Sequence, residues 1–109
     1  MGWTVEILNE TVAAELSGLS VDLRAKFYRI AQLLETFGPH IVREPYVKPL
    51  EGKLWEIRMK GRDGIGRAVY IAASDQRLIV LLAFIKKTPK TPRGVLELAY
   101  RRARDGGLL

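Results

Sequence analysis

Three lysines, Lys86, Lys87 and Lys90, directly follow a long apolar run and alternate with two prolines. The run, residues 78–85, consists of eight apolar residues. A strand that is apolar along its whole length must be covered on both faces. The run therefore predicts a central strand of a sheet. A strand fixed in this way, leading into a proline-containing loop, would hold the lysine charges at one edge of the fold. A fixed group of positive charges suits the binding of a phosphate.

Three further strands are predicted around this central one. Residues 3–8 and 54–60 alternate between apolar and polar side chains, as half-buried strands do. Residues 66–73 form the third, between a glycine-rich turn and a second turn at residues 74–77. Residues 40–53 contain two prolines and a glycine and are expected to form a loop.

A helical hairpin is predicted between the first two of these strands. Residues 11–19 form a short helix, and Ser20 can cap a second helix that has Asp22 in its first turn. The second helix has one apolar stripe, spaced by four, three, four and three residues: Leu23, Phe27, Ile30, Leu34 and Phe37. Gly38 and Pro39 end it.

The last predicted element is a C-terminal helix. Thr91 is its expected N-cap, with Pro92 at the first helical position and residues 95–104 in its body. The chain therefore predicts a single α+β domain over residues 1–109. It would be a small antiparallel sheet, a meander of three C-terminal strands plus the N-terminal strand, with a helical hairpin on one face and a C-terminal helix. We expect the helices on one face.

The composition excludes several kinds of site. With no cysteine and one histidine, His40, thiolate sites, disulfides and histidine-based metal sites are not expected. We expect no signal peptide, and no stretch approaches the ~20 apolar residues of a membrane span. These features fit a cytoplasmic protein that uses neither metal nor cofactor. The net charge of +6 favours a polyanionic partner, and seven Lys or Arg against one acid lie between Lys86 and Arg104.

Three segments follow the short strand and the helical hairpin: residues 48–58 (KPLEGKLWEIR), Gly66-Arg-Ala-Val-Tyr70, and residues 84–92 (FIKKTPKTP). Together they resemble the phage-derived, HigB-like branch of the RelE toxin superfamily. The resemblance implies a compact sheet like that of microbial RNases. It also implies a type II toxin that inhibits translation by metal-independent cleavage of mRNA, usually in the ribosomal A site. Its partner would be a co-transcribed antitoxin, a helix-turn-helix protein of the HigA type.

Four residues are predicted to form the catalytic group. Arg58 and Arg67 are assigned to the phosphate, because a guanidinium binds phosphate through two hydrogen bonds. Lys87 matches the family's cation at the strand exit, and Tyr70 could stack on a base or donate a proton. Arg67 and Tyr70 have opposite parity in a regular strand, so a bulge is needed to bring both to one site. None of the four is a clear general base.

Four more basic residues are expected to contact the RNA backbone: Lys53, Lys86, Lys90 and Arg93. Two alternatives stay open. ParE-like relatives inhibit gyrase by binding it and lack the cationic cluster, and a non-catalytic RNA-binding module would need no active site. The lack of an exposed aromatic series argues against stacking on single-stranded RNA. Arg58 could also be only part of a solvated strand face, and the loop lysines could only guard an apolar strand against aggregation.

Overall fold

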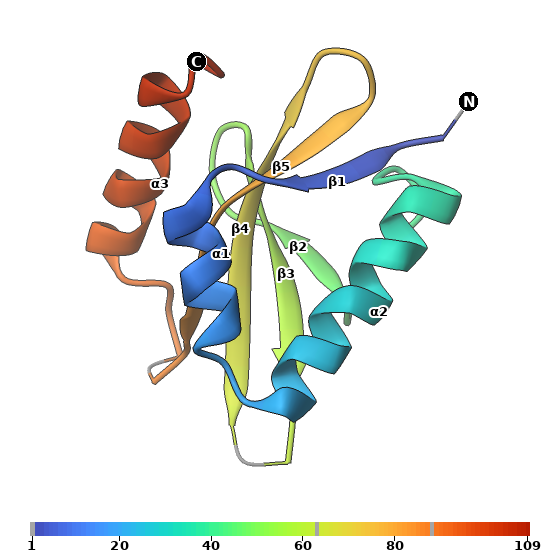
Figure 1. The fold of residues 1–109 in the computed structure, drawn as a ribbon, viewed down its shortest axis with the longest axis vertical. Coiled ribbons are helices and arrows are strands. Elements are labelled where there is room, and N and C mark those ends of the chain that lie inside the picture. The colour runs from blue at the N-terminus through green and yellow to red at the C-terminus, as the bar shows by residue number, and fades with distance from the viewer. Residues whose placement is uncertain (1, 63, 88) are drawn as a thin grey trace.

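The computed structural model describes residues 2–62, 64–87 and 89–109. Within them the elements follow in the order β1 (Thr4–Ile7), α1 (Glu10–Ser17), α2 (Val21–Phe37), β2 (Val47–Pro49), β3 (Leu54–Lys60), β4 (Ile65–Ala73), β5 (Arg77–Ile85) and α3 (Arg93–Asp105). The strands form a five-stranded sheet in the order β1-β5-β4-β3-β2 (Figure 1). β1 runs parallel to β5, and the other neighbours are antiparallel. The predicted α+β class is confirmed.

The apolar run at residues 78–85 lies in β5, between β1 and β4 in the sheet. Residues 78–83 are all buried, as expected for a strand that is covered on both faces. The exit loop that carries the lysines leaves from its end. The predicted central strand is therefore confirmed, and it places the start of this loop beside β4.

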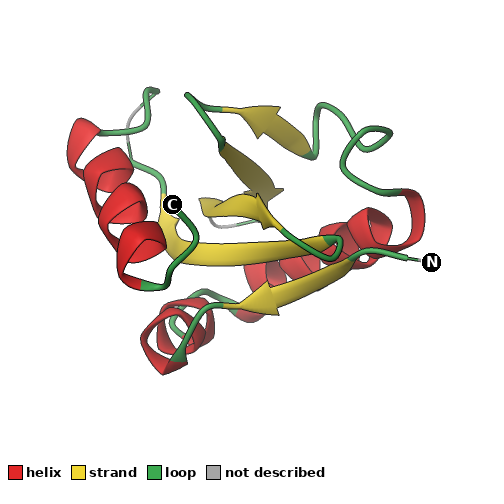
Figure 2. Cartoon of the chain, turned by 90° about the horizontal axis from the view of Figure 1, so that it is seen from above, coloured by secondary structure: helices red, strands yellow, loops and turns green. Residues whose placement is uncertain are grey.

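Helices cover both faces of the sheet (Figure 2). On one side the stripe of α2 is buried against the sheet, although Phe37 at its end is 57% exposed and does not join it. On the other side α3 packs through Ala99 and Ala103, whose small side chains allow close approach, against Val69 and Leu81. The expectation of helices on one face is therefore wrong for α3. A central strand that is apolar on both faces requires this second cover.

Two of the three helices are capped by a side chain. The Asn9 side chain accepts from Val12 N at 3.0 Å, and the Ser20 hydroxyl accepts from Leu23 N at 3.2 Å, as predicted for α2. α3 begins after Pro92, and no side chain caps it there. The predicted cap by Thr91 is wrong, because the Thr91 hydroxyl donates to Glu56 instead.

Residues 40–53 are not entirely a loop, because they contain β2, which pairs with β3 through only three residues. Pro45 before this strand and Pro49 at its end hid so short a strand from the alternation pattern. No helix in the described ranges is long and apolar enough to cross a membrane.

α3 is fastened to the sheet at a β-bulge. The β4–β5 register shifts between Val69 and Tyr70, which leaves Leu81 as the extra residue of β5. Arg102 donates to the Leu81 carbonyl at 2.9 Å and pairs with Glu15 of α1 at 2.8 Å. This pairing raises the pKa of Arg102, mainly through its hydrogen bond to Glu15. We call Glu15 and Arg102 the helix clasp.

Candidate functional site

Several charged side chains gather on the α3 side of the sheet, near the end where β5 leads into the exit loop. Arg58 of β3 pairs with Arg67 of β4, and Lys48 of β2 pairs with Glu56 of β3. Because side chains alternate along a strand, these four share the face on which α3 lies. Their positions follow from strand registers alone, so the arrangement rests on rigid elements.

Glu56 is the centre of this group. Its side chain is 3% exposed, and Oε1 lies 3.4 Å from Arg67 Nε and 3.9 Å from Arg58 Nε. The Thr91 hydroxyl donates to Oε2 at 3.4 Å. Sequence reasoning missed Glu56 because it reads as one more polar residue on an alternating strand. Two features of the sequence could have pointed to Glu56. These are its neighbour Arg58 and the presence of Leu54 on the same face of the strand.

Arg67 is buried with more positive than negative charge around it. Its side chain is 4% exposed, and Nη1 donates to the Gly66 carbonyl at 2.9 Å. Nε makes no hydrogen bond within the described part of the chain. Burial lowers the pKa of Arg67, Glu56 acts in the opposite direction, and Arg58 adds a smaller lowering. A bound anion would further stabilise the charged form of this buried guanidinium.

Lys86 is the exit-loop lysine that the structure brings to the cluster. Its N–H donates to the Ile65 carbonyl at 2.7 Å, which continues the β4–β5 ladder by one residue. Burial lowers the pKa of the half-buried Lys86, the charges of Arg67, Arg58 and Lys48 lower it further, and Glu56 acts in the opposite direction. A lysine whose pKa is lowered gives up its proton more readily.

A hollow of about 260 Å³ opens beside the two arginines. It is lined by Pro45, Arg58, Lys60, Ile65 and Arg67. Arg58 keeps 28% of its side chain exposed here, and an exposed carboxylate, Glu44, lies 3.7 Å from its Nη1. Three cations around one hollow suit a phosphate group. We call Glu56, Arg58, Arg67 and Lys86, together with this hollow, the basic cluster.

Tyr70 does not lie in the basic cluster. It pairs with Trp55 in the β3–β4 register and packs on the α2 side of the sheet, where it is 1% exposed. The bulge that would have brought it beside Arg67 is present, but its extra residue is Leu81 in β5 and not a residue of β4. Arg67 and Tyr70 therefore keep the opposite parity that the sequence predicts.

The remaining predicted residues are spread over the exit loop, the turn between β2 and β3, and the start of α3. Lys87 and Lys90 are exposed in the exit loop, in which Thr88 lies outside the described residues. Lys53 is exposed in the turn between β2 and β3, at the other end of β3 from Lys60. Arg93 is 63% exposed at the start of α3 and pairs with Glu51 of that turn at 2.9 Å.

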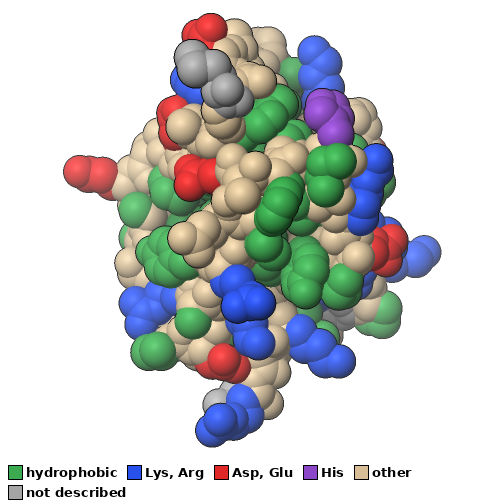
Figure 3. Space-filling view, turned by 90° about the vertical axis from the view of Figure 1, so that its right-hand side faces the viewer, with side chains coloured by type: hydrophobic (Ala, Val, Ile, Leu, Met, Phe, Trp, Pro, Cys, Tyr) green, Lys and Arg blue, Asp and Glu red, His purple; other side chains and the backbone are tan. Residues whose placement is uncertain are grey.

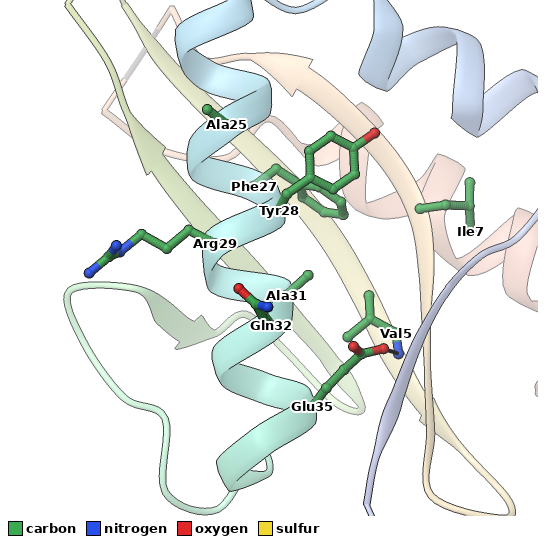
Figure 4. A pocket seen from close by; sticks show the side chains of 9 residues that line it. All are labelled: Val5, Ile7, Ala25, Phe27, Tyr28, Arg29, Ala31, Gln32 and Glu35. Carbon is green, nitrogen blue, oxygen red and sulfur yellow. Dashed lines mark hydrogen bonds between the residues drawn. The ribbon is translucent and has the colours of Figure 1, made fainter.

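A wider hollow lies elsewhere, between α2 and β1, and measures about 580 Å³ (Figure 4). Glu35 accepts from Val5 N at 2.8 Å across it, and Arg29 points away from β1. Tyr28 is 62% exposed on its wall. This groove lacks a group of cations, so its chemistry is less specific than that of the basic cluster. Across the described chain there is no cluster of three or more His, Cys, Asp or Glu that could hold a metal ion.

Comparison with known structures gives the RelE fold. The free E. coli toxin RelE, solved as a double arginine-to-alanine mutant, matches with a TM-score of 0.67 and 17% identity over 94% of this chain and 98% of RelE. RelE of an archaeal RelE–RelB complex from Pyrococcus horikoshii matches with a TM-score of 0.57 and 25% identity, over 78% of this chain and 96% of that one. No curated protein matches the chain significantly.

The family comparison covers most of the sequence. Residues 14–104 match the model of the phage-derived Gp49-like proteins, a range that extends from α1 through the sheet and into α3. The basic cluster lies within this range. The resemblance to the phage-derived, HigB-like branch of the RelE superfamily is therefore confirmed, and the chain belongs to the family of phage-derived Gp49-like proteins.

Proposed function

We propose that this protein is the toxin of a type II toxin-antitoxin system and cleaves mRNA without a metal ion. The proposal rests on the hollow between Arg58 and Arg67, where buried and half-buried cations outnumber the one carboxylate between them. The family and the RelE fold support a toxin. Cleavage in the ribosomal A site would inhibit translation.

In this mechanism the scissile phosphate enters the hollow and contacts Arg58 and Arg67. Attack by the neighbouring 2′-oxygen, whose proton passes to solvent water, gives a phosphorane with two negative charges, which the two guanidiniums and Lys60 stabilise. Departure of the 5′-oxygen then leaves a 2′,3′-cyclic phosphate. Groups that are already fixed before the charge develops need no reorganisation, and this electrostatic effect is usually the largest in such sites. Arg67 is held by the Gly66 carbonyl and by Glu56, so it meets this condition.

Lys86 protonates the departing 5′-oxygen. Its pKa is lowered by burial and by the surrounding cations, so it is a stronger acid than an ordinary lysine. General acid catalysis of this kind contributes roughly 10²–10⁴-fold. Lys87 and Lys90, next along the exit loop, contact the RNA backbone, as do Lys53 and Arg93.

Glu56 is a positioning residue in this proposal. It is buried, covered by the Thr91 hydroxyl, and in contact with both arginines, so it fixes the direction of their guanidiniums. The ribosome contributes by holding the mRNA in line, because orientation alone removes a large part of such a barrier. The chain thus supplies charge and a proton, and the ribosome supplies the geometry of the RNA.

The partner is proposed to be a HigA-like helix-turn-helix antitoxin. A chain of the archaeal RelE–RelB complex has the same fold, which supports an antitoxin partner. Bound antitoxin would keep RNA from the basic cluster. Copurification of the protein with the product of a neighbouring gene, and loss of toxicity on coexpression, would test this part separately.

Expression of the chain in bacteria, followed by primer extension on abundant mRNAs, tests the proposed activity. We expect new 5′ ends inside translated frames with the wild type and none with Arg58→Gln or Arg67→Gln. Arg101→Gln, on the exposed face of α3, is the matched control and should cleave normally. Growth arrest without new 5′ ends would contradict the proposal and favour a protein target such as gyrase.

A further inference from the structure

The sheet has an open edge at β1. This strand is the last in the order β1-β5-β4-β3-β2, and within the described chain it pairs only with β5. Thr4 N and Leu8 N face β5, since both donate to carbonyls on that side, at 3.0 and 3.1 Å. Because backbone groups alternate in direction along a strand, those of Val5 and Ile7 point outward. An outward row of N–H and C=O groups is a template for a further strand.

The groove between α2 and β1 runs along this open edge. Its β1 wall is formed by Val5 and Ile7, and Ala25 and Tyr28 lie on its α2 wall (Figure 4). A second hollow of about 270 Å³ shares Ala25 and Tyr28 with the groove and extends it to Val21. Figure 3 looks onto the α2 side, where hydrophobic side chains lie among Lys and Arg side chains. A mostly apolar surface therefore adjoins the outward backbone groups of β1.

Glu35 imitates a neighbouring strand at one end of the groove. Its carboxylate accepts from Val5 N at 2.8 Å, as the carbonyl of an added strand would. Charged side chains at a sheet edge guard it against unspecific pairing. Here the guard covers one donor, and the groove continues past it to Ile7 and Tyr28. The edge is thus protected against chance pairing but suits a strand that also fills the groove.

The charge around the groove indicates the kind of partner. Arg29 lines the groove, and Arg24 lines the hollow that extends it. The two acids of α2, Asp22 and Glu35, both accept from backbone N–H groups, at 2.6 and 2.8 Å. A second copy of the chain would bring its own net charge of +6 to this edge, which opposes pairing between copies. An acidic segment would instead be attracted.

We propose that an extended, acidic segment of the antitoxin adds to the sheet beside β1. Its backbone pairs with the outward groups of Ile7 and with the Val5 carbonyl, its alternate apolar side chains pack against Tyr28, and an acid meets Arg29. In strand addition the backbone hydrogen bonds give affinity and the side-chain contacts give specificity. This inference rests on the proposed function, because its partner is the proposed antitoxin. It separates the surface that anchors the antitoxin from the basic cluster on the α3 side.

Amide hydrogen exchange tests the strand pairing. The full chain would be measured alone and in complex with the purified product of the neighbouring gene. We expect Ile7 N–H to exchange about tenfold more slowly, or slower still, in the complex, whereas Leu8 N–H, already bonded to β5, should change less. Unchanged exchange at Ile7 in a formed complex overturns this inference and leaves the antitoxin partner in place. If the wild type does not bind the product, both fail.

Substitutions on α2 test the groove itself. Tyr28→Ala should weaken binding of the gene product by about tenfold or more, through loss of an aromatic contact. Arg29→Glu should weaken it by repelling the acidic segment. Lys26→Glu makes the same charge change at an exposed position of the same helix that does not line the groove, and should bind nearly as tightly as the wild type.

Toxicity provides a second readout for the same variants. Tyr28→Ala and Arg29→Glu should arrest growth as the wild type does but resist neutralisation when the gene product is coexpressed. Wild-type affinity in both variants overturns the inference. So does a dimer of the chain alone that is lost in Tyr28→Ala, because the open edge would then be occupied by a second copy. Binding is measured without RNA, so failure of the proposed nuclease would not alter these results.

Discussion

The helix clasp and the basic cluster are built from the same residue types and differ in their balance of charge. In the clasp one carboxylate meets one guanidinium through two hydrogen bonds at 2.8 and 2.9 Å, and the pKa of Arg102 is raised. In the basic cluster one carboxylate lies between two guanidiniums, and burial lowers the pKa of Arg67 although Glu56 opposes this. The clasp pairs one guanidinium with one carboxylate, whereas in the basic cluster two guanidiniums share the buried Glu56 and the second carboxylate, Glu44, is exposed. A binding site of this kind differs from a structural ion pair because cations outnumber buried carboxylates at a position that the strands hold fixed.

The largest expected effect is the loss of cleavage in Arg67→Gln. Removing one preorganised donor to a developing oxyanion costs about 10²–10³-fold in such sites. Single-turnover cleavage of ribosome-bound mRNA would measure it. Arg102→Gln, the matched change in the clasp, should cleave at the wild-type rate per folded molecule. Equal losses in the two variants would break the distinction between the two regions.

The next largest effect is on stability. Here Arg102→Gln should have a greater effect than Arg67→Gln. It removes charge-assisted hydrogen bonds to Glu15 and to the Leu81 carbonyl, both partly buried, which are worth about 2 kcal/mol. Thermal unfolding should shift down by roughly 10 °C. Arg67→Gln should shift it less, because burial already disfavours the charge of Arg67. A larger shift for Arg67→Gln would mean that the basic cluster is chiefly structural.

Lys86 and Lys87 provide a comparison between neighbours in the chain. Lys86→Met should lower cleavage by at least tenfold through loss of the acid, and Lys87→Met should lower it less, through weaker RNA binding. Because the pKa of Lys86 is lowered, cleavage should fall with rising pH earlier than for an ordinary lysine. Arg58→Gln should move this fall to higher pH. The prediction fails if Lys87→Met causes the greater loss.

The smallest effect is expected at Tyr70, on the other side of the sheet. Its pKa is raised by burial, so the folded state holds the phenol proton more tightly than the unfolded chain does. The stability this gives is complete below the unfolded pKa near 10 and is lost as the pH rises above it. The free energy of unfolding should therefore fall with pH above about 10, by up to about 1.4 kcal/mol per unit from this residue. Urea unfolding of the wild type and Tyr70→Phe at alkaline pH would show a smaller fall in the variant.

Local patterns were sufficient to predict most of the fold. Alternation placed β3, the apolar run placed β5, and Ser20 and Gly38 marked the two ends of α2. The side on which α3 packs was not predictable in this way, because it depends on which face of β5 the α1–α2 pair leaves open. Thr91 was misread as a cap for the same reason: its partner, Glu56, is 35 residues away in the chain.

The candidate site was only partly open to prediction. Residue type pointed to Arg58 and Arg67, but Tyr70, which was placed in the same group on the condition of a bulge, lies on the other face of the sheet. The burial of Glu56 could not be read from the sequence, because two other strands and the exit loop produce it. The proximity of Lys86 to the cluster depends on one hydrogen bond to Ile65, which continues the ladder by a single residue. A contact that depends on one extra residue of strand pairing can be predicted only when the register of the two strands is known.

The most direct test of the basic cluster is single-turnover cleavage of mRNA in the A site of programmed ribosomes with purified protein and no divalent metal beyond that needed by the ribosome. The wild type and Arg102→Gln should cut at the same positions and at similar rates, whereas Arg58→Gln and Arg67→Gln should be slower by about 10²–10³-fold. Wild-type rates in both of the latter variants would contradict the account, because the charge surplus beside Glu56 would then have no part in the reaction.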